Sequence, residues 1–69
     1  DPSHGTGLRH AVVPMANAAM AVQADGVMVE VHTDPDRSVS DAKQTISTEM
    51  FSDMMGTLRK VGHAFDRQL

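Results

Sequence analysis

One short run of residues, Val27 to Val31, strongly limits what this chain can fold into. It is β-branched and apolar at nearly every position, instead of at alternate positions as in a half-exposed strand. Such a run is typical of a strand in a parallel sheet that is covered on both faces. The run therefore predicts an α/β protein in which other strands and helices surround this segment.

Two amphipathic helices are predicted on either side of this strand. Apolar residues recur at three- and four-residue spacing over residues 11–22 and again over 48–66, where Ser47 or Thr48 is a suitable N-cap. Residues 1–11 and 32–47 are polar, and we expect loops there. The order loop, helix, strand, loop, helix is that of part of a repeating β/α series.

The chain is short for such an architecture. A domain of 69 residues buries only about 60% of the surface that its unfolded chain exposes, so little stability remains after the entropy of ordering it. There is no cysteine for a disulfide or a thiolate site. The chain also starts, at Asp1, inside a dense polar motif. We therefore expect residues 1–69 to be a fragment of a longer domain.

Composition argues against two classes of function. The formal net charge is −3, and Lys and Arg are not clustered as a nucleic-acid surface requires. No apolar run approaches the roughly 20 residues of a membrane-spanning helix, and no signal peptide is recognisable. We expect a cytoplasmic protein that binds neither nucleic acid nor membrane.

Glu30 is the one charged residue inside the apolar run. A carboxylate that stays buried and unpaired is costly, so it must be protonated, paired or bound to a cation. Glu30 lies near the C-terminal end of the predicted strand, and in α/β barrels that end carries the catalytic face. An edge-exposed Glu that merely interrupts the run is the alternative interpretation.

His4 and Asp41 are candidates of a related kind. Taken alone, His4 is better explained as a surface or hydrogen-bonded packing histidine, and Asp41 as a solvated loop acid. Together with Glu30 they supply one imidazole and two carboxylates, a set suited to Mn²⁺, Fe²⁺, Co²⁺ or Zn²⁺. His32 lies two residues after Glu30, on the same face of the strand, and offers a fourth polar group.

Five motifs of the sequence resemble one enzyme family. They are Asp1-Pro2-Ser3-His4-Gly5-Thr6-Gly7, Pro14-Met15-Ala16, Ala24-Asp25-Gly26, Glu30-Val31-His32, and Ser40-Asp41 followed by Gln44. In this order and spacing they are similar to the C-terminal part of the microbial 3-deoxy-D-arabino-heptulosonate 7-phosphate (DAHP) synthases that are close to 3-deoxy-D-manno-octulosonate 8-phosphate (KDO8P) synthases. The similarity runs through nearly the whole chain.

The resemblance implies a fold and a reaction. Residues 1–69 would be the C-terminal portion, with the last strands and helices, of a single (β/α)8 TIM-barrel domain. The family condenses phosphoenolpyruvate with erythrose 4-phosphate in an aldol-type reaction that releases phosphate. This reaction is the first step of the shikimate pathway, which leads to the aromatic amino acids. We also expect a homo-oligomer.

The resemblance further implies a metal site. The family's divalent metal is held by a Cys, a His, a Glu and an Asp, and the last three fall on His4, Glu30 and Asp41. The Cys and the basic residues that hold the substrate phosphates fall outside the chain, so residues 1–69 alone are expected to be inactive. No catalytic residue is assigned, and the charged residues Arg9, His10 and Lys43 are left out of the site.

Two positions depart from the family pattern. Gln23 and Ala42 stand where glycine is expected, and a side chain at a turn that needs a positive φ would strain or remodel it. Three alternatives to a DAHP synthase stay open: a KDO8P synthase, a small association module that uses its Met-rich helix faces, and a free-standing metal-binding protein in which His32 supplies a fourth ligand.

Overall fold

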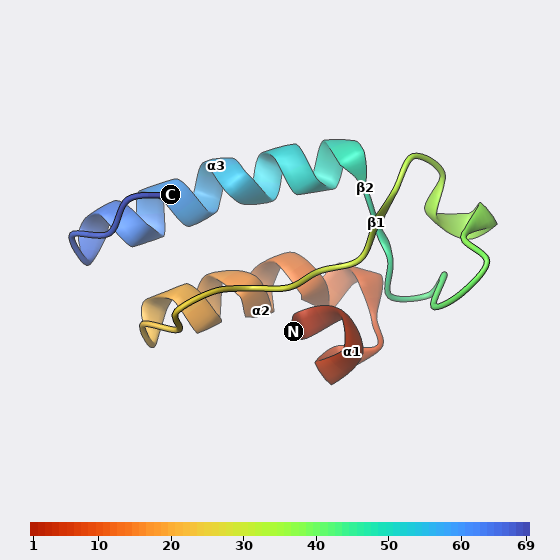
Figure 1. The fold of residues 1–69 in the computed structure, drawn as a ribbon, viewed down its shortest axis with the longest axis horizontal. Coiled ribbons are helices and arrows are strands. Elements are labelled where there is room, and N and C mark those ends of the chain that lie inside the picture. Colours follow the sequence, from red (N-terminus) through yellow and green to blue (C-terminus); the bar gives the residue numbers. More distant parts are fainter.

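A computed structural model describes all residues, 1–69, as a small α/β unit. The elements follow the order α1 (Pro2–Thr6), α2 (Arg9–Ala21), β1 (Val31–His32), the 3-10 helix η1 (Pro35–Arg37), β2 (Ile46–Ser47) and α3 (Thr48–Ala64). Figure 1 shows the long helices α2 and α3 side by side, with both strands and η1 gathered at one end. Residues 32–47, the longer polar stretch of the sequence, lie at that end.

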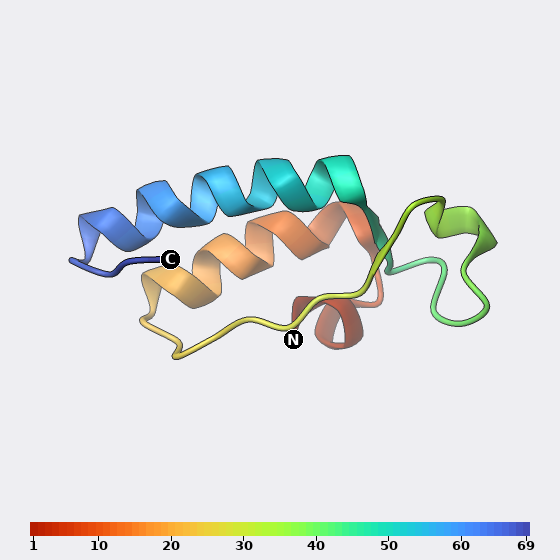
Figure 2. The same ribbon diagram turned by 45° about the horizontal axis from the view of Figure 1, so that its top comes forward.

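The core lies between α2 and α3. Its buried apolar side chains are Val12, Ala16 and Met20 of α2, Ile46 of β2, and Met54 and Leu58 of α3. The three- and four-residue spacing within each helix turns these side chains toward the other helix. The extended segment before β1 runs beside α2, as Figure 2 shows, and its Val27 and Val29 pack against this core.

The first eleven residues are not a loop, as predicted, because Pro2–Thr6 form a short helix. Asp1 is its N-cap, and Pro2 occupies the first turn, where the missing N–H of proline has no cost. Gly7, with a φ of 65°, ends the helix, and its N–H donates to the carbonyl of Ser3. These start and stop signals were present in the sequence.

The prediction of a strand over residues 27–31 was wrong in its bounds. Only Val31–His32 form a ladder, in parallel register with Ile46–Ser47, so a strand also lies inside the predicted 32–47 loop. Residues 27–30 are extended, but no strand pairs with them. A segment without a partner strand cannot form a ladder. Met28 is 67% exposed, so the segment is covered on one face and not on both.

Helix α3 confirms the helix predicted over residues 48–66, although it ends two residues earlier, at Ala64. Its N-cap is Ser47, whose Oγ accepts a hydrogen bond from the backbone N–H of Met50 at 3.0 Å. Met54 and Leu58 of the predicted stripe are buried, whereas Phe65 is 43% exposed. None of the helices combines the length and apolar character that crossing a membrane requires.

Helix α2 ends in a Schellman motif that usually contains glycine. The N–H of Ala24 donates to the carbonyl of Ala19, and the N–H of Gln23 donates to that of Met20, both at 2.9 Å. Gln23 has a φ of 66°, so the glycine expected at this position matches a left-handed backbone. Ala42 has no positive φ, and the expected strain falls instead on the residue before it, Asp41.

Replacing Gln23 with Gly is therefore expected to stabilise the protein that contains this chain. A side chain in the left-handed region costs about 1–2 kcal/mol, and the flexibility that glycine adds to the unfolded chain offsets about 0.4–1 kcal/mol of that gain. Urea denaturation should show Gln23→Gly to be more stable by about 0.5–1 kcal/mol. The neighbouring change Ala24→Gly, at a negative φ, should destabilise instead, and equal effects of both changes would contradict the explanation.

Candidate metal site

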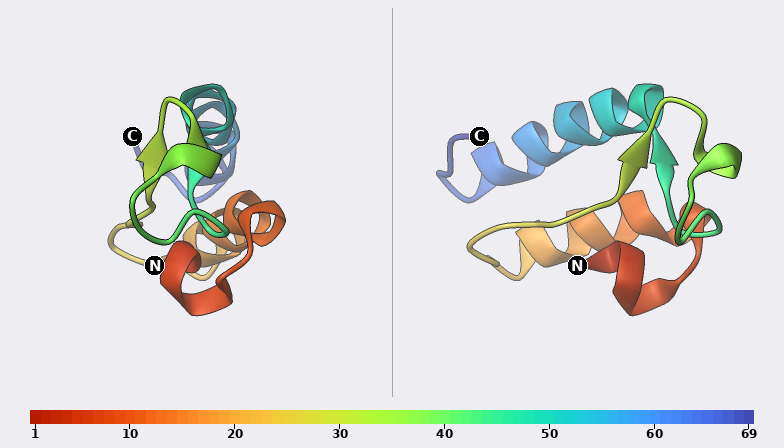
Figure 3. Two further views of the ribbon diagram at one scale, coloured as in Figure 1. Left: turned by 90° about the vertical axis from the view of Figure 1, so that its right-hand side faces the viewer. Right: turned by 45° about the vertical axis from the view of Figure 1, so that its right-hand side comes forward.

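Three separate segments bring the predicted ligands together beside the two strands. His4 comes from α1, Glu30 immediately precedes β1, and Asp41 lies in the turn before β2. Figure 3 shows these three segments at the same end of the molecule, with α1 and the turn before β2 close to each other. Residues that are 37 positions apart in the sequence, from 4 to 41, therefore contribute to one group.

The side-chain atoms of these three residues are close enough to share one ion. His4 Nε2 lies 2.6 Å from Glu30 Oε1 and 3.4 Å from Asp41 Oδ2, and one ligand atom from each residue lies within 4.8 Å of the others. Ligand atoms held about 2.0–2.2 Å from a single ion are about 3–4 Å apart. The 3.4 Å separation is of that size, whereas the 2.6 Å separation is that of a hydrogen bond and would widen when both atoms bind one ion.

Glu30 is the best-fixed member of the group. Its backbone N–H donates to the hydroxyl of the fully buried Ser3 at 3.0 Å, and its carbonyl accepts from the N–H of Ile46 at 2.9 Å. The carboxylate also accepts hydrogen bonds from Gln44 Nε2 at 3.4 Å and from Thr45 Oγ1 at 3.3 Å. The Glu30 carboxylate is therefore hydrogen-bonded and not isolated, as we expected of a charged residue inside an apolar run.

Asp41 reaches the group through an unusual backbone conformation. Its φ is 53°, in the left-handed region, which Asp tolerates better than most residues because its short polar side chain can bond locally. The carbonyl of Asp41 accepts hydrogen bonds from the N–H groups of Gln44 and Thr45, each at 3.1 Å. A compact turn therefore holds the Asp41 side chain, which remains 45% exposed.

Arg9 fastens this turn to the start of α2. Its Nε donates to the carbonyl of Thr45 at 2.6 Å, and its Nη2 donates to the carbonyl of Ala42 at 2.7 Å. Nη2 also lies 2.9 Å from Oδ1 of Asp36, and the backbone N–H of Arg9 donates to the carbonyl of Lys43. Sequence reasoning missed this role, because the partners are mainly backbone carbonyls more than thirty residues away.

The other histidine near the strand stands apart from the group. His32 Nδ1 accepts a hydrogen bond from the backbone N–H of Asp34 at 2.8 Å, and His32 is not among the clustered donors. Its ring therefore closes the turn after β1. His10 and Lys43 are exposed, and no hydrogen bond or ion pair connects their side chains to the three candidate ligands.

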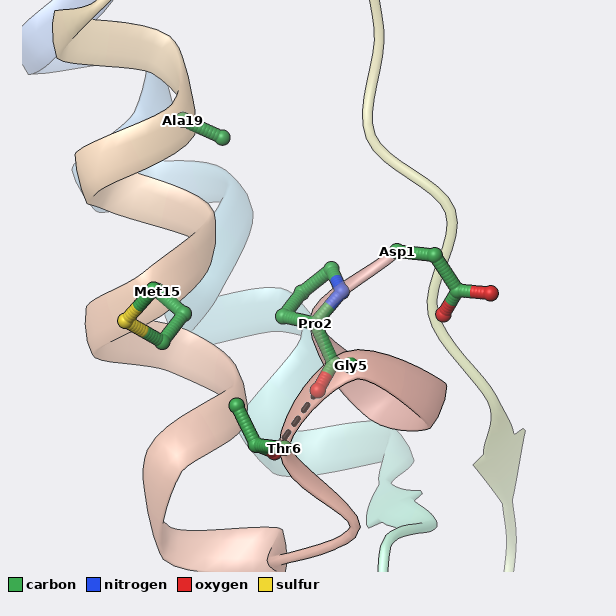
Figure 4. A pocket seen from close by; sticks show the side chains of 6 residues that line it. All are labelled: Asp1, Pro2, Gly5, Thr6, Met15 and Ala19. Carbon is green, nitrogen blue, oxygen red and sulfur yellow. Dashed lines mark hydrogen bonds between the residues drawn. The ribbon is translucent and has the colours of Figure 1, made fainter.

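A small hollow lies between α1 and α2, and none of the three candidate ligands lines it. It has a volume of about 250 Å³ and is lined by Asp1, Pro2, Gly5, Thr6, Met15 and Ala19. Figure 4 shows Met15 and Ala19 on α2 facing it, while the carboxylate of Asp1 points away from them. Two of the lining residues are hydrogen-bonded to each other, because Thr6 Oγ1 donates to the carbonyl of Pro2 at 2.7 Å. The polar groups there are satisfied within α1.

The donor chemistry fits a divalent cation. One imidazole nitrogen and two carboxylates are ligands common to Zn²⁺, Mn²⁺, Fe²⁺ and Co²⁺. The side chains of His4 and Asp41 are 53% and 45% exposed, whereas that of Glu30 is 24% exposed. The group is therefore anchored on the protein side and open on the other, which leaves space for further ligands.

Comparison with known proteins gives a consistent result. The chain is 42% identical over 64 residues to the phospho-2-dehydro-3-deoxyheptonate aldolase of Thermotoga maritima, a match that covers 93% of this chain and 19% of that protein. It is 31% identical over 61 residues to the 2-dehydro-3-deoxyphosphooctonate aldolase of Desulfotalea psychrophila, covering 88% and 22%. The protein of the same name from Methylobacterium radiotolerans is 41% identical over 61 residues, covering 88% and 20%.

These matches concern only part of each relative. The chain spans about a fifth of the length of the curated relatives it matches. The model of the DAHP synthetase I family matches residues 1–66, which include all three candidate ligands. The chain therefore belongs to the DAHP synthetase I family.

Proposed function

We propose that this chain is the C-terminal part of a (β/α)8-barrel DAHP synthase, which condenses phosphoenolpyruvate with erythrose 4-phosphate. The observation that carries the proposal is the convergence of His4, Glu30 and Asp41 from three segments onto one point. In a barrel of parallel strands, that point would lie at the C-terminal ends of the strands, where active sites form.

The exposed apolar surface supports a barrel around this unit. The sheet has only two strands, so each strand has an unpaired edge. Large apolar side chains are exposed as well, at Leu8, Met15, Val22, Met28, Val31, Val39, Phe51, Phe65 and Leu69. Neighbouring strands and helices of a complete domain would cover such surfaces. Residues 1–69 would then form one portion of a single barrel domain.

We propose His4, Glu30 and Asp41 as three ligands of a divalent metal ion, Mn²⁺, Fe²⁺, Co²⁺ or Zn²⁺. When bound, such an ion supplies Lewis-acid chemistry, which polarises a carbonyl oxygen near the site. The two carboxylates of the chain balance the charge of the cation, and the imidazole of His4 adds a neutral donor. Glu30, held by Ser3, Gln44 and Thr45, fixes the place of the site relative to β1.

The names of the relatives define a choice of substrate. A heptonate contains seven carbons and an octonate eight, so a three-carbon phosphoenolpyruvate needs a four-carbon aldehyde phosphate for the former product and a five-carbon one for the latter. The relative named for the heptonate is 42% identical over 64 residues, and the motifs around Pro2-Ser3 and Gln44 resemble DAHP synthases. We therefore propose erythrose 4-phosphate as the aldehyde.

The test is a product assay on the full-length protein that contains this chain. Phosphoenolpyruvate is supplied with either erythrose 4-phosphate or the five-carbon arabinose 5-phosphate, in the presence of Mn²⁺, and phosphate release and product mass are measured. We expect phosphate release with a seven-carbon product. Formation of only an eight-carbon product would make the protein a KDO8P synthase, and no condensation with either aldehyde would overturn the proposed function. Residues 1–69 alone should form neither product.

A further inference from the structure

Asp1 contacts His4 at two places. Its Oδ1 accepts a hydrogen bond from the backbone N–H of His4 at 3.1 Å, which is the N-cap contact of α1. Its other oxygen, Oδ2, lies 2.7 Å from Nδ1 of the His4 ring. A capping role accounts for the first contact but does not require the second.

The second contact determines which ring nitrogen is available to a bound cation. An ionised carboxylate only accepts hydrogen bonds, so Nδ1 of His4 must be the donor in its contact with Asp1. Nε2 faces a carboxylate as well, so this assignment holds once a cation is bound: Nδ1 then keeps the proton that it donates to Asp1, and the lone pair for the cation is on the opposite nitrogen, Nε2. This is the atom that lies 2.6 Å from Glu30 and 3.4 Å from Asp41.

We infer that Asp1 is a positioning residue, which holds the His4 ring with the Nε2 lone pair directed at the metal site. The inference rests on the proposed metal-dependent function. A carboxylate that accepts the free N–H of a ligating histidine fixes the orientation of the ring and raises its basicity as a ligand. The rigid link through α1 adds to this, because Asp1 and His4 are joined by one helical turn.

Two substitutions separate positioning from capping. In Asp1→Asn, the amide oxygen can still accept from the His4 backbone N–H, because Asn is a good N-cap. Its NH₂ group, however, faces Nδ1 as a donor and favours the ring form in which Nε2 carries the proton and has no free lone pair. In Asp1→Ser, the hydroxyl retains the cap but is too short to reach Nδ1 as well.

The experiment titrates the metal-free full-length protein with Zn²⁺ and, separately, Mn²⁺, and compares affinities. We expect Asp1→Asn to bind each ion about 10–100-fold more weakly, as for other partners of ligating histidines, and Asp1→Ser to lie between it and the unsubstituted protein. Asp25→Asn, a change at an exposed acid outside the group, should leave the affinity unchanged. Circular dichroism should report the same helix content for all four proteins.

A second measurement observes the ring directly. In the Zn²⁺-loaded protein with ¹⁵N-labelled histidine, NMR should show a protonated Nδ1 on His4 that exchanges slowly with water, and this signal should be lost or exchange fast in Asp1→Ser. If Asp1→Asn and Asp1→Ser both bind the ions as tightly as the unsubstituted protein, Asp1 is only a helix cap and the inference is wrong. If the unsubstituted protein binds neither ion, the proposed function and this inference fail together.

Discussion

Replacing Glu30 with Ala in the full-length protein is expected to weaken metal binding by more than 100-fold and to lower turnover to a similar extent. Changes at the partners of metal ligands already cost about 10–100-fold, and Glu30 is proposed as a ligand itself. Its carboxylate also lies 2.6 Å from His4 Nε2, so its loss removes one of the groups that contact the His4 ring. The measurements are metal content after dialysis and the rate of phosphate release.

Two further variants make this prediction specific. Glu30→Gln retains the size of the side chain and can still bond to Gln44 and Thr45, so a loss of metal with little change in stability would identify the charge as the cause. Glu49→Ala, at an exposed position in the first turn of α3, should behave like the unsubstituted protein. Normal metal content and turnover in both His4→Ala and Glu30→Ala would contradict the proposed site.

Replacing Arg9 with Met is expected to destabilise the protein by about 2–4 kcal/mol and to loosen the turn that carries Asp41. The guanidinium donates to the carbonyls of Thr45 and Ala42 at 2.6 and 2.7 Å, and hydrogen bonds to a charged group contribute about 1.5–3 kcal/mol each. Met retains much of the aliphatic length of Arg but cannot donate. Urea denaturation measures the loss of stability, and hydrogen exchange at residues 41–46 measures the loosening.

The control for Arg9 is an arginine outside such a network. Arg59 is exposed on α3 and forms no ion pair, so Arg59→Met should change stability by less than about 0.5 kcal/mol. Arg9→Lys should resemble Arg9→Met more than the unsubstituted protein, because one ammonium group cannot reproduce the fork of a guanidinium. If hydrogen exchange at residues 41–46 stays at its original rate in Arg9→Met, the turn does not depend on Arg9.

The helices were predictable from sequence because their signals are local. The spacing of Val12, Ala16 and Met20 in α2, and the N-cap at Ser47, predict elements that the structure contains. The strands were harder to predict. Residues 27–31 carry a strand-like sequence, but strand length depends on the partner, and only Ile46–Ser47 pair with this segment. This partner strand was missed because it lies inside residues 32–47, where the polar sequence predicted a loop.

The three candidate ligands could be named from sequence, but the residues that hold them could not. Glu30 was conspicuous as a charge in an apolar run, and His4 and Asp41 followed from the resemblance to the family. Arg9 and Thr45 act through backbone carbonyls and through Glu30, which no local pattern reveals. Asp1 is the exception, because an Asp followed by Pro, three positions before a His, is a readable helix start.

The left-handed backbone at Asp41, with its φ of 53°, has a consequence for how this position can change during evolution. Few residue types accept that conformation without strain, and glycine and asparagine are the main ones besides aspartate. Both lie a single base change away from the aspartate codons. A descendant that loses the carboxylate can therefore keep the shape of the turn. Loss of the proposed metal ligand and loss of the turn would be separate evolutionary events at this position.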